Sequence, residues 1–266
     1  MKQPIIVIKC GGSVINSISE SSALCQNIKA LQDGGYKVVL IHGGGPEISK
    51  LAQIYQLESQ FIDGMRVTNA AMIELTQMAL IGTNNTNLVN QLNQFGLSAI
   101  GLSGHDNQLL RANYLDFDKL GYVGEISAIN HELINLLLTH QLIPVIAPLA
   151  IDTAGKTLNV NADMVAGALA SKLAAQALIL LSDIDGYYAN YPDKNSIVPL
   201  LTTTAVQQLL DNKQVTSGMI PKLKSCLLAI NHDAQKAYII NGTAKYNLVD
   251  LLNEPSAGGT CVIKGA

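Results

Sequence analysis

Short aliphatic runs recur along the chain and alternate with longer amphipathic stretches. Isoleucine, valine and leucine dominate the runs, which lack the apolar–polar alternation of a strand with one wet face. They occupy residues 5–8, 38–41, 99–102, 144–147, 178–181, 237–240 and 261–263. Continuous apolar strands of this kind are typical of a mainly parallel sheet covered by helices on both faces. The pattern therefore predicts an α/β fold.

The stretches between the runs supply the helices. Residues 69–93 form one candidate, which Gly96 closes, and residues 218–231 form another, with Met219 and Leu223 on its apolar stripe. The chain has no Trp and only 3 Phe, so its interior must be built from Leu, Ile, Val and Ala. Such a core suits helices layered on a sheet.

Two segments, residues 61–68 and 151–160, have the alternation and turn residues of β-hairpins. A third hairpin is expected between residues 111 and 126, and we expect the hairpins at the rim of the sheet. A chain of 266 residues accommodates one large α/β unit or two lobes. With two lobes, the boundary falls near Ala175, between a helix and the strand at 178–181.

Charge and cysteine content exclude several classes of protein. The net charge of −3 comes from 17 basic and 20 acidic residues that are scattered along the chain, which argues against a nucleic-acid or polybasic membrane surface. Four distant cysteines without a CxxC pair argue against a zinc site and a disulfide scaffold. The apolar start is too short for a signal peptide. We therefore expect a cytoplasmic protein with reduced thiols.

Glycine clusters follow three of the expected strands, at residues 11–12, 43–45 and 186. Glycine after a parallel strand permits a sharp turn and lets backbone N–H groups face an anion, although a plain βα turn explains a single glycine pair equally well. Neither GxxxxGK[ST] nor GxGxxG occurs, so a P-loop and a dinucleotide-binding Rossmann site are not supported. The segments 131–135 and 101–104 miss the HExxH and GxSxG patterns and are interpreted as local structure.

Two lysines stand in unusual places, and one aspartate could hold them together. Lys9 ends the first aliphatic strand, at the edge where open α/β sheets bind ligands, and Lys222 lies near the start of an expected helix. A cation there opposes the helix dipole unless an anion lies nearby. Asp163 opens another helix, where it could serve as a first-turn carboxylate or hold the two lysines. Solvent-exposed lysines that extend along the surface remain the structural alternative.

Taken together, these features resemble the acetylglutamate kinases of the amino acid kinase family, and the resemblance extends over nearly the whole chain. The matching segments are residues 7–12, 42–46, 64–68, 159–163, 181–186 and 218–222. The first and fifth belong to the wider family, whereas Gly-Met-Arg-Val-Thr at 64–68 and Asn-Val-Asn-Ala-Asp at 159–163 mark the acylglutamate kinases. Met65 and Ser217 depart from residues common in the family, but neither change removes a charge that the chemistry requires.

The resemblance implies ATP-dependent phosphorylation of the side-chain carboxylate of N-acetyl-L-glutamate, the second step of arginine biosynthesis. It also implies a three-layer αβα sandwich around a mainly parallel sheet, as in carbamate kinases, with two lobes. Residues 1–175 would bind the amino acid and dimerise, and residues 176–266 would bind ATP. Because the chain begins at its first strand, without the N-terminal helix of arginine-inhibited members, we expect an arginine-insensitive homodimer.

The resemblance further assigns roles to single residues. Lys9 and Lys222 would stabilise the transferring phosphoryl group, and Asp163 would orient them. The residues that would hold the acetylated amino acid are Gly44, Gly45, Arg66 and Asn159, with Arg66 pairing with a carboxylate. Those that would bind ATP are Gly11, Gly12, Asp183, Gly186, Tyr187, Gln214, Thr216 and Met219. Mg²⁺ would be carried by the ATP phosphates, without a metal site on the protein.

Three alternatives remain open at this stage. Another carboxylate or carbamate kinase of the superfamily, such as an aspartate or glutamate kinase, would share the fold, but Arg66 and Asn159 favour an acetylated substrate. A non-catalytic sensor on the same scaffold has no use for charges that stabilise a transition state. A generic α/β protein, in which every glycine cluster is a turn, predicts that the two lysines are dispensable.

Overall fold

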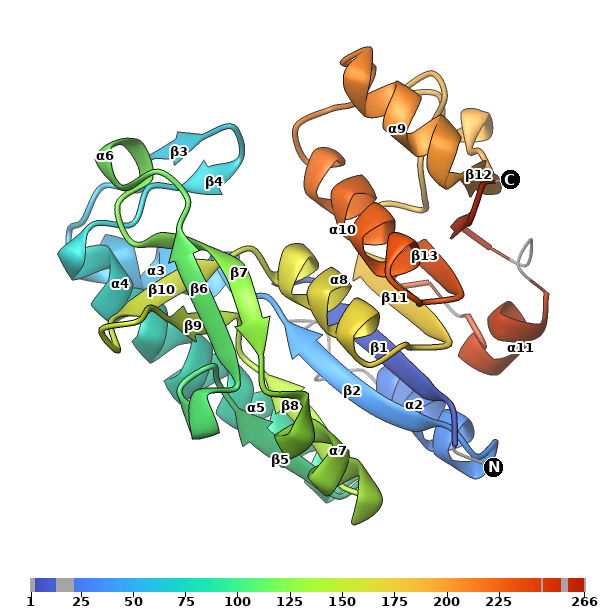
Figure 1. The fold of residues 1–266 in the computed structure, drawn as a ribbon, viewed down its shortest axis with the longest axis horizontal. Helices are drawn as coiled ribbons and strands as arrows, with labels where there is room; N and C mark the ends of the chain where they lie inside the picture. The colour runs from blue at the N-terminus through green and yellow to red at the C-terminus, as the bar shows by residue number, and fades with distance from the viewer. Residues whose placement is uncertain (1–2, 13–21, 245, 255–257, 266) are drawn as a thin grey trace.

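An eight-stranded sheet forms the centre of the protein (Figure 1). We describe it from a computed structural model that covers residues 3–12, 22–244, 246–254 and 258–265. The strand order is β12-β14-β13-β11-β1-β2-β8-β5, and neighbours are parallel except β13 and β14. These strands are β1 (Ile5–Cys10), β2 (Lys37–His42), β5 (Ala99–Leu102), β8 (Ile143–Ile146), β11 (Ala177–Ser182), β12 (Leu200–Thr202), β13 (Lys236–Asn241) and β14 (Thr260–Ile263). All seven predicted strands are confirmed, and β12 is an addition.

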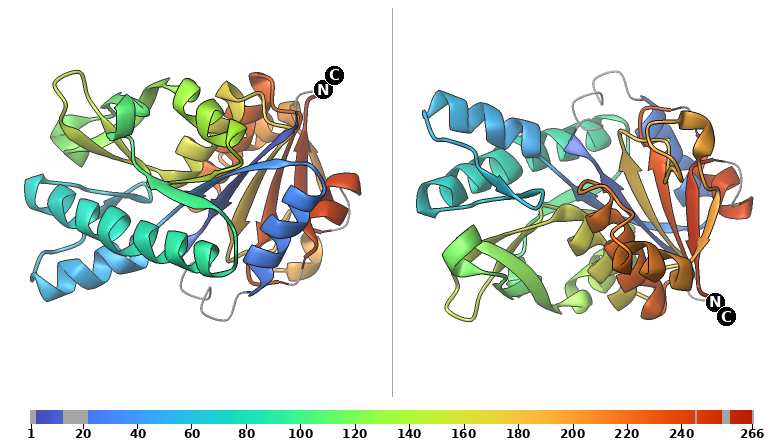
Figure 2. Two further views of the ribbon diagram at one scale, coloured as in Figure 1. Left: turned by 90° about the horizontal axis from the view of Figure 1, so that it is seen from below. Right: turned by 90° about the horizontal axis from the view of Figure 1, so that it is seen from above.

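Helices cover both faces of this sheet, as Figure 2 shows from two sides. The α-helices of the described residues are α2 (Ser22–Asp33), α3 (Gly45–Ile54), α4 (Ala70–Gln77), α5 (Thr86–Gln94), α6 (Phe117–Leu120), α7 (His131–Thr139), α8 (Ala162–Lys172), α9 (Thr203–Asp211), α10 (Ile220–Asn231) and α11 (Leu248–Asn253), of which α6 lies beside the β3–β4 hairpin (residues 61–66) instead. Side chains alternate along β1, so Val7 packs with α8 and α10 in one core, whereas Ile6 and Ile8 pack with α2 and α11 in another. The predicted three-layer sandwich is therefore confirmed.

The helix predicted at residues 69–93 exists, but its centre is wider than an α-helix. Asn69 caps α4 by accepting a hydrogen bond from the Met72 N–H, and α4 continues without a break through a π-helical segment, Met78–Asn85, into α5. Gly96, with φ +87°, ends the run. A π-helical turn is uncommon and often marks a functional site.

The hairpins lie differently from the prediction. The segments around 111–126 and 151–160 do pair as hairpins, β6 (Leu110–Tyr114) with β7 (Val123–Ile129) and β9 (Leu149–Ile151) with β10 (Thr157–Val160). Instead of extending the rim of the main sheet, they close on each other as a small barrel in the order β10-β7-β6-β9. Closure removes the exposed edges that two separate hairpins would present.

The third hairpin, β3 (Phe61–Ile62) with β4 (Met65–Arg66), stands apart as a two-stranded ribbon. Its turn residues Asp63 and Gly64 both have positive φ, 50° and 78°, as a type I′ turn requires. The ribbon lies beside α6 near the carboxyl ends of the central strands (Figure 1). No helix in the described ranges is long and apolar enough to cross a membrane.

Candidate active site

A cleft of about 1660 Å³ opens at the carboxyl ends of β1, β2 and β11. It is lined by the glycine loops after β1 and β2, by the β3–β4 ribbon, and by the amino-terminal parts of α8 and α10. In open α/β sheets this edge is where ligands bind. Of the sequence-predicted site residues, the lining includes Lys9, Gly11, Gly12, Gly44, Gly45, Arg66, Asn159, Asp183 and Lys222.

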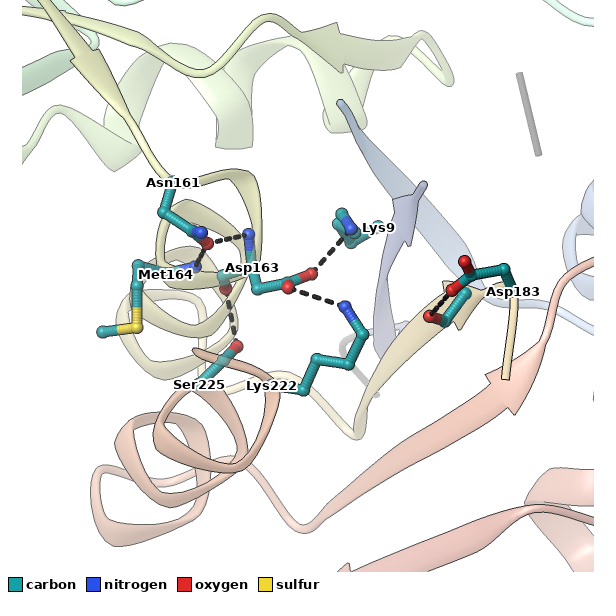
Figure 3. A network of polar contacts seen from close by, with 8 residues as sticks. Lys9, Asn161, Asp163, Met164, Asp183, Lys222 and Ser225 are labelled. Atoms are coloured by element: carbon teal, nitrogen blue, oxygen red, sulfur yellow. Dashed lines mark hydrogen bonds and ion pairs between the residues drawn. The ribbon is translucent and has the colours of Figure 1, made fainter. Parts of the chain in front are cut away.

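Lys9 and Lys222 converge on Asp163 in the wall of this cleft (Figure 3). The Lys9 Nζ lies 2.7 Å from Asp163 Oδ1, and the Lys222 Nζ donates a hydrogen bond of 2.9 Å to Asp163 Oδ2. All three side chains are largely buried, with exposed fractions of 9%, 13% and 7% for Lys9, Lys222 and Asp163. The structure thus brings together three residues that lie far apart in the sequence.

Local structure explains how each member reaches this point. Lys9 follows Val7 by two positions, so strand alternation directs it to the face covered by α8 and α10. Asn161 caps α8 by accepting hydrogen bonds from the N–H groups of Asp163 and Met164, which places Asp163 in the first turn. Lys222 occupies the first turn of α10, which Ile220 begins.

Helices α8 and α10 approach closely enough to bring Asp163 and Lys222 into contact. The Ser225 Oγ donates a 2.6 Å hydrogen bond to the backbone oxygen of Asp163. A side chain at Gly167 would not fit, because its Cβ would lie 2.6 Å from the Ser225 carbonyl oxygen. A glycine is therefore required here for the contact between the two helices.

The site carries an excess of positive charge. Burial disfavours the ionised form of Asp163, but the charges of Lys9 and Lys222 outweigh it and hold the pKa of this carboxyl below its ordinary value. One carboxylate then faces two ammonium groups, which leaves a net charge of about +1 beside the cleft. Such an arrangement can attract and stabilise a polyanion.

The two glycine loops pack against each other at the floor of the cleft. Gly43 donates its N–H to the Cys10 carbonyl at 2.9 Å, and a Cβ at Gly12 would lie 2.8 Å from Pro46 Cδ. A Cβ at Gly44 would collide with Asn84, whereas a Cβ at Gly45 would meet open space. Positions 12 and 44 therefore have no room for a side chain beside their packed neighbours, whereas Gly45 borders the cleft itself.

Arg66 is a buried cation without an acidic partner within 4 Å in the described part of the chain. Its guanidinium donates to the Ser59 hydroxyl at 2.6 Å, the Ser49 hydroxyl at 2.8 Å and the Gly45 carbonyl at 3.2 Å, and it lies over the Phe61 ring. Burial lowers the pKa of Arg66, yet the guanidinium stays charged at any ordinary pH. A charge that is oriented but unpaired suits an anionic ligand.

Asn159 lines the same cleft as Arg66 and is connected to it through Thr68. Its Nδ2 donates a 3.2 Å hydrogen bond to the Thr68 hydroxyl, which in turn donates to the Arg66 carbonyl at 2.9 Å. Strand β10 places Asn159 in the barrel, and its amide lines the cleft. The barrel therefore presents the Asn159 amide to the same cleft that Arg66 lines, and Thr68 links this amide to the Arg66 backbone.

The predicted ATP-binding residues of the carboxyl-terminal half divide into two groups. Asp183 follows β11, is exposed in the cleft, and accepts a 3.1 Å hydrogen bond from the Ser182 hydroxyl. The cleft lining does not include Gly186, Tyr187, Gln214, Thr216 or Met219. Tyr187 and Met219 are instead buried in the core, while Gln214 and Thr216 are exposed ahead of α10.

Several residues of the site were not anticipated from the sequence. Asn161 had a recognisable signal, because asparagine immediately before an apolar helix is a common N-cap. Ser225, Ser49 and Ser59 had none, because their contacts depend on how the elements pack. The same holds for Asn84, which reaches the glycine loop from the π-helical segment.

The fold and the lysine-rich cleft define a class of phosphotransferase, and comparison with known proteins agrees. The sequence model of the amino acid kinase family matches residues 4–241, and the chain belongs to this family.

Individual similar proteins indicate which members of this family the chain resembles. The acetylglutamate kinase of Bacillus velezensis is 40% identical over 259 residues, which is 97% of this chain and 96% of that protein. Among solved structures, smu.665 from Streptococcus mutans UA159 has a TM-score of 0.87 at 32% identity and covers 99% of this chain and 100% of its own. Carbamate kinase from Giardia lamblia, at 17% identity and a TM-score of 0.75, covers 99% of both chains and shares the fold.

Proposed function

We propose that this protein transfers the γ-phosphoryl group of ATP to the side-chain carboxylate of N-acetyl-L-glutamate, forming an acyl phosphate and ADP. The observation that carries the proposal is the contact of Lys9 and Lys222 with one buried carboxylate at the edge of a shared cleft. This reaction is the one that the name of the Bacillus velezensis relative describes, and it is the second step of arginine biosynthesis.

The reaction needs positive charge rather than a base. A carboxylate nucleophile with an ordinary pKa near ~4.3 is already ionised at pH 7, so no proton must be removed before it attacks phosphorus. Two anions must instead approach each other, and charge develops on the equatorial oxygens of the transferring group. Lys9 and Lys222 would neutralise that charge, and Asp163 would hold both ammonium groups in place before the substrates arrive.

The amino-acid substrate would bind at the end of the cleft that holds Arg66. The guanidinium would pair with a substrate carboxylate, which supplies the acidic partner that Arg66 lacks in the described part of the protein. Asn159, Gly44 and Gly45 would complete this subsite, with the amide and backbone groups facing the acetylated amino acid. The hydrogen bonds from Arg66 to Ser49 and Ser59 support the role, because they fix the guanidinium in advance.

ATP would bind beyond the lysines, with its phosphates over Gly11 and Gly12. Roles for Gly186, Tyr187, Gln214, Thr216 and Met219 stay a prediction, since these residues lie outside the cleft lining. Asp183 offers a carboxylate oxygen, the kind of ligand a hard cation takes, so Mg²⁺ carried on the ATP phosphates fits the residues present. When bound, Mg²⁺ would neutralise phosphate charge.

We infer that residues 1–175 form the lobe that binds the amino acid and that residues 176–266 form the ATP lobe. A homodimer would assemble through the first of these. Strand β5 is one of the two edge strands of the described sheet, and the helical segment beside it exposes Met78 and Phe95 by 50% and 42%. Light scattering on the purified protein tests this, because a monomer at micromolar concentration would contradict it.

A cytoplasmic location fits the proposed pathway. Cys10, Cys25, Cys226 and Cys261 are all free and buried, as expected for a protein kept in a reducing compartment.

The proposed reaction is tested by coupling ADP release to a spectrophotometric assay with ATP, Mg²⁺ and N-acetyl-L-glutamate. Free glutamate, aspartate and carbamate serve as competing acceptors. Turnover at least tenfold faster with the acetylated substrate supports the proposal. Preference for a free amino acid or carbamate would assign a different kinase of the family, and binding of both substrates without ADP release would indicate a sensor.

A further inference from the structure

Two adjacent asparagines of the π-helical segment are buried beneath the glycine loop that follows β2. Asn84 and Asn85 are each only 6% exposed. The Asn84 Nδ2 donates a 3.2 Å hydrogen bond to the Gly43 carbonyl. The Asn85 Nδ2 lies 3.1 Å from His42 Nε2 and donates a 2.9 Å hydrogen bond to the Val145 carbonyl. Both side chains thus point inward, away from solvent.

The π-helical geometry accounts for two adjacent inward residues. In an α-helix neighbouring residues are turned by about 100° from each other, so only one would face the loop squarely. The wider π-helical turn reduces this rotation, and both amides reach the end of β2. The uncommon backbone of Met78–Asn85 therefore has a specific result, which is to bring two amide donors to residues 42 and 43.

The hydrogen bonds also define the proton position on His42. This ring is fully buried, and its Nδ1 lies 2.9 Å from the Gly43 carbonyl oxygen, which can only accept. Nδ1 must therefore carry the hydrogen, and Nε2 accepts from the Asn85 amide. Burial lowers the pKa of His42 to about 4, so the ring stays neutral at pH 7.

These contacts fix one peptide bond of the glycine loop. The Gly43 carbonyl accepts from both His42 and Asn84, which uses its two lone pairs, while the Gly43 N–H donates to Cys10. The C=O and N–H of a trans peptide point in opposite directions. With the carbonyl held toward His42 and Asn84, the Gly44 N–H points the other way, and it has no acceptor in the described part of the chain. Gly44 lines the cleft.

We propose that Asn84, Asn85 and His42 are positioning residues that orient the Gly43–Gly44 peptide so that the Gly44 N–H faces the reacting anions. Asn84 acts directly on the carbonyl, and Asn85 acts through the His42 ring, because it donates to Nε2 while Nδ1 faces the Gly43 carbonyl. The glycines leave room for a ligand, and the asparagines fix the orientation of the peptide bond. This inference rests on the proposed function, because it assigns the N–H donor to the phosphoryl group or the substrate carboxylate.

The kinetic test replaces Asn84 by a group of the same shape that cannot donate. Asn84→Asp places an acceptor against the Gly43 carbonyl and disfavours the observed peptide orientation. We expect kcat/KM for N-acetyl-L-glutamate to fall by about tenfold to a hundredfold in protein that remains folded by circular dichroism. Asn87→Asp, an exposed residue on α5, is the matched control and should change kcat/KM less than twofold.

The spectroscopic test does not depend on activity. Long-range ¹H–¹⁵N spectra of the ligand-free protein should show the Nδ1–H tautomer of His42, and Asn85→Ala should shift the Nε2 resonance, because Nε2 loses its donor while Nδ1–H still faces the Gly43 carbonyl. Asn84→Asp should shift the Gly44 amide resonance, whereas Asn87→Asp should not. A merely structural role would lower the melting temperature without moving these signals.

The outcomes separate the two proposals. If the wild type phosphorylates N-acetyl-L-glutamate and the folded Asn84→Asp variant has the same kcat/KM, the positioning role is wrong and the proposed function stands. If the wild type does not phosphorylate N-acetyl-L-glutamate, the function is wrong, and the spectra then decide the peptide orientation. An Nε2–H tautomer of His42 in the wild type would overturn the inference in either case.

Discussion

The ammonium groups of Lys9 and Lys222 contact different oxygen atoms of the same carboxylate, that of Asp163, at 2.7 and 2.9 Å. A strand and a helix from opposite ends of the chain thus deliver two cations to one anion. The carboxylate offsets their mutual repulsion without cancelling their charge. The positive charge that remains is in place before substrates bind, which is what catalysis of transfer between two anions requires.

Replacing either lysine should abolish most of the catalytic rate. We expect Lys9→Ala and Lys222→Ala each to lower kcat by about 10²-fold or more, because the remaining lysine is then neutralised by Asp163 and the excess charge is lost. Steady-state ADP release measures this. Lys29→Ala, on the exposed surface of α2, is the control and should retain kcat. A folded Lys222→Ala variant with kcat within threefold of the wild type would contradict the proposed mechanism.

Removing the carboxylate should cost stability as well as activity. In Asp163→Asn two buried ammonium groups lose their counter-charge, and we expect the free energy of unfolding to fall by about 3 kcal/mol. Urea denaturation followed by fluorescence measures the change. Asp33→Asn, which breaks an exposed pair with Lys29, should cost less than about 1 kcal/mol. Equal losses in the two variants would show that burial of the Asp163 pair contributes nothing.

Arg66 should determine affinity more than rate. Because the guanidinium would pair with a carboxylate remote from the reacting atoms, Arg66→Ala should raise KM for N-acetyl-L-glutamate by about tenfold to a hundredfold, with a smaller change in kcat. KM for ATP should stay constant. Arg111, the second arginine of the chain, is exposed on β6, and Arg111→Ala provides the comparison. A loss confined to kcat would assign Arg66 to the transition state instead.

Two adjacent glycines should respond differently to alanine. The methyl group of Gly44→Ala would collide with Asn84 and Leu80, so we expect a loss of stability of about 1–3 kcal/mol. The methyl group of Gly45→Ala meets no protein atom within 4 Å, so the protein should melt at the wild-type temperature. Calorimetry and kinetics separate the cases: Gly45→Ala should raise KM for the amino acid while remaining stable. Unaltered KM and stability in both variants would refute the proposed loop geometry.

Stability should decline as the pH falls below about 6.5. Burial lowers the pKa of His42 from 6.5 to about 4, so the unfolded chain binds a proton in this window that the folded protein does not. The unfolding free energy therefore falls between these values, by roughly 3 kcal/mol for this residue, and levels off below them. Urea denaturation at several pH values gives the unfolding free energy as a function of pH. The slope of this plot between the two pKa values should be smaller by about one proton in His42→Gln.

The amino-acid pattern alone determined seven of the eight strands of the central sheet and the three charged candidates. The aliphatic runs of β1, β2 and β11 are buried on both faces, so local sequence locates these strands without knowledge of their neighbours. Asp63-Gly64 specifies its turn in the same local way. Lys9 and Lys222 were recognisable because a lysine at the end of a buried strand or in the first turn of a helix is uncommon, whereas Asp163 could also have been an ordinary first-turn carboxylate.

Only the tertiary structure decided how these parts meet. The joining of β6, β7, β9 and β10 into a barrel depends on pairings between distant segments, which local alternation does not encode. The shared carboxylate of Asp163 depends on the close contact of α8 with α10 at Gly167. The inward direction of Asn84 and Asn85 depends on a π-helical turn that residue propensities do not predict. Packing between remote elements determines each of these features, so they follow from the folded protein and not from its local sequence.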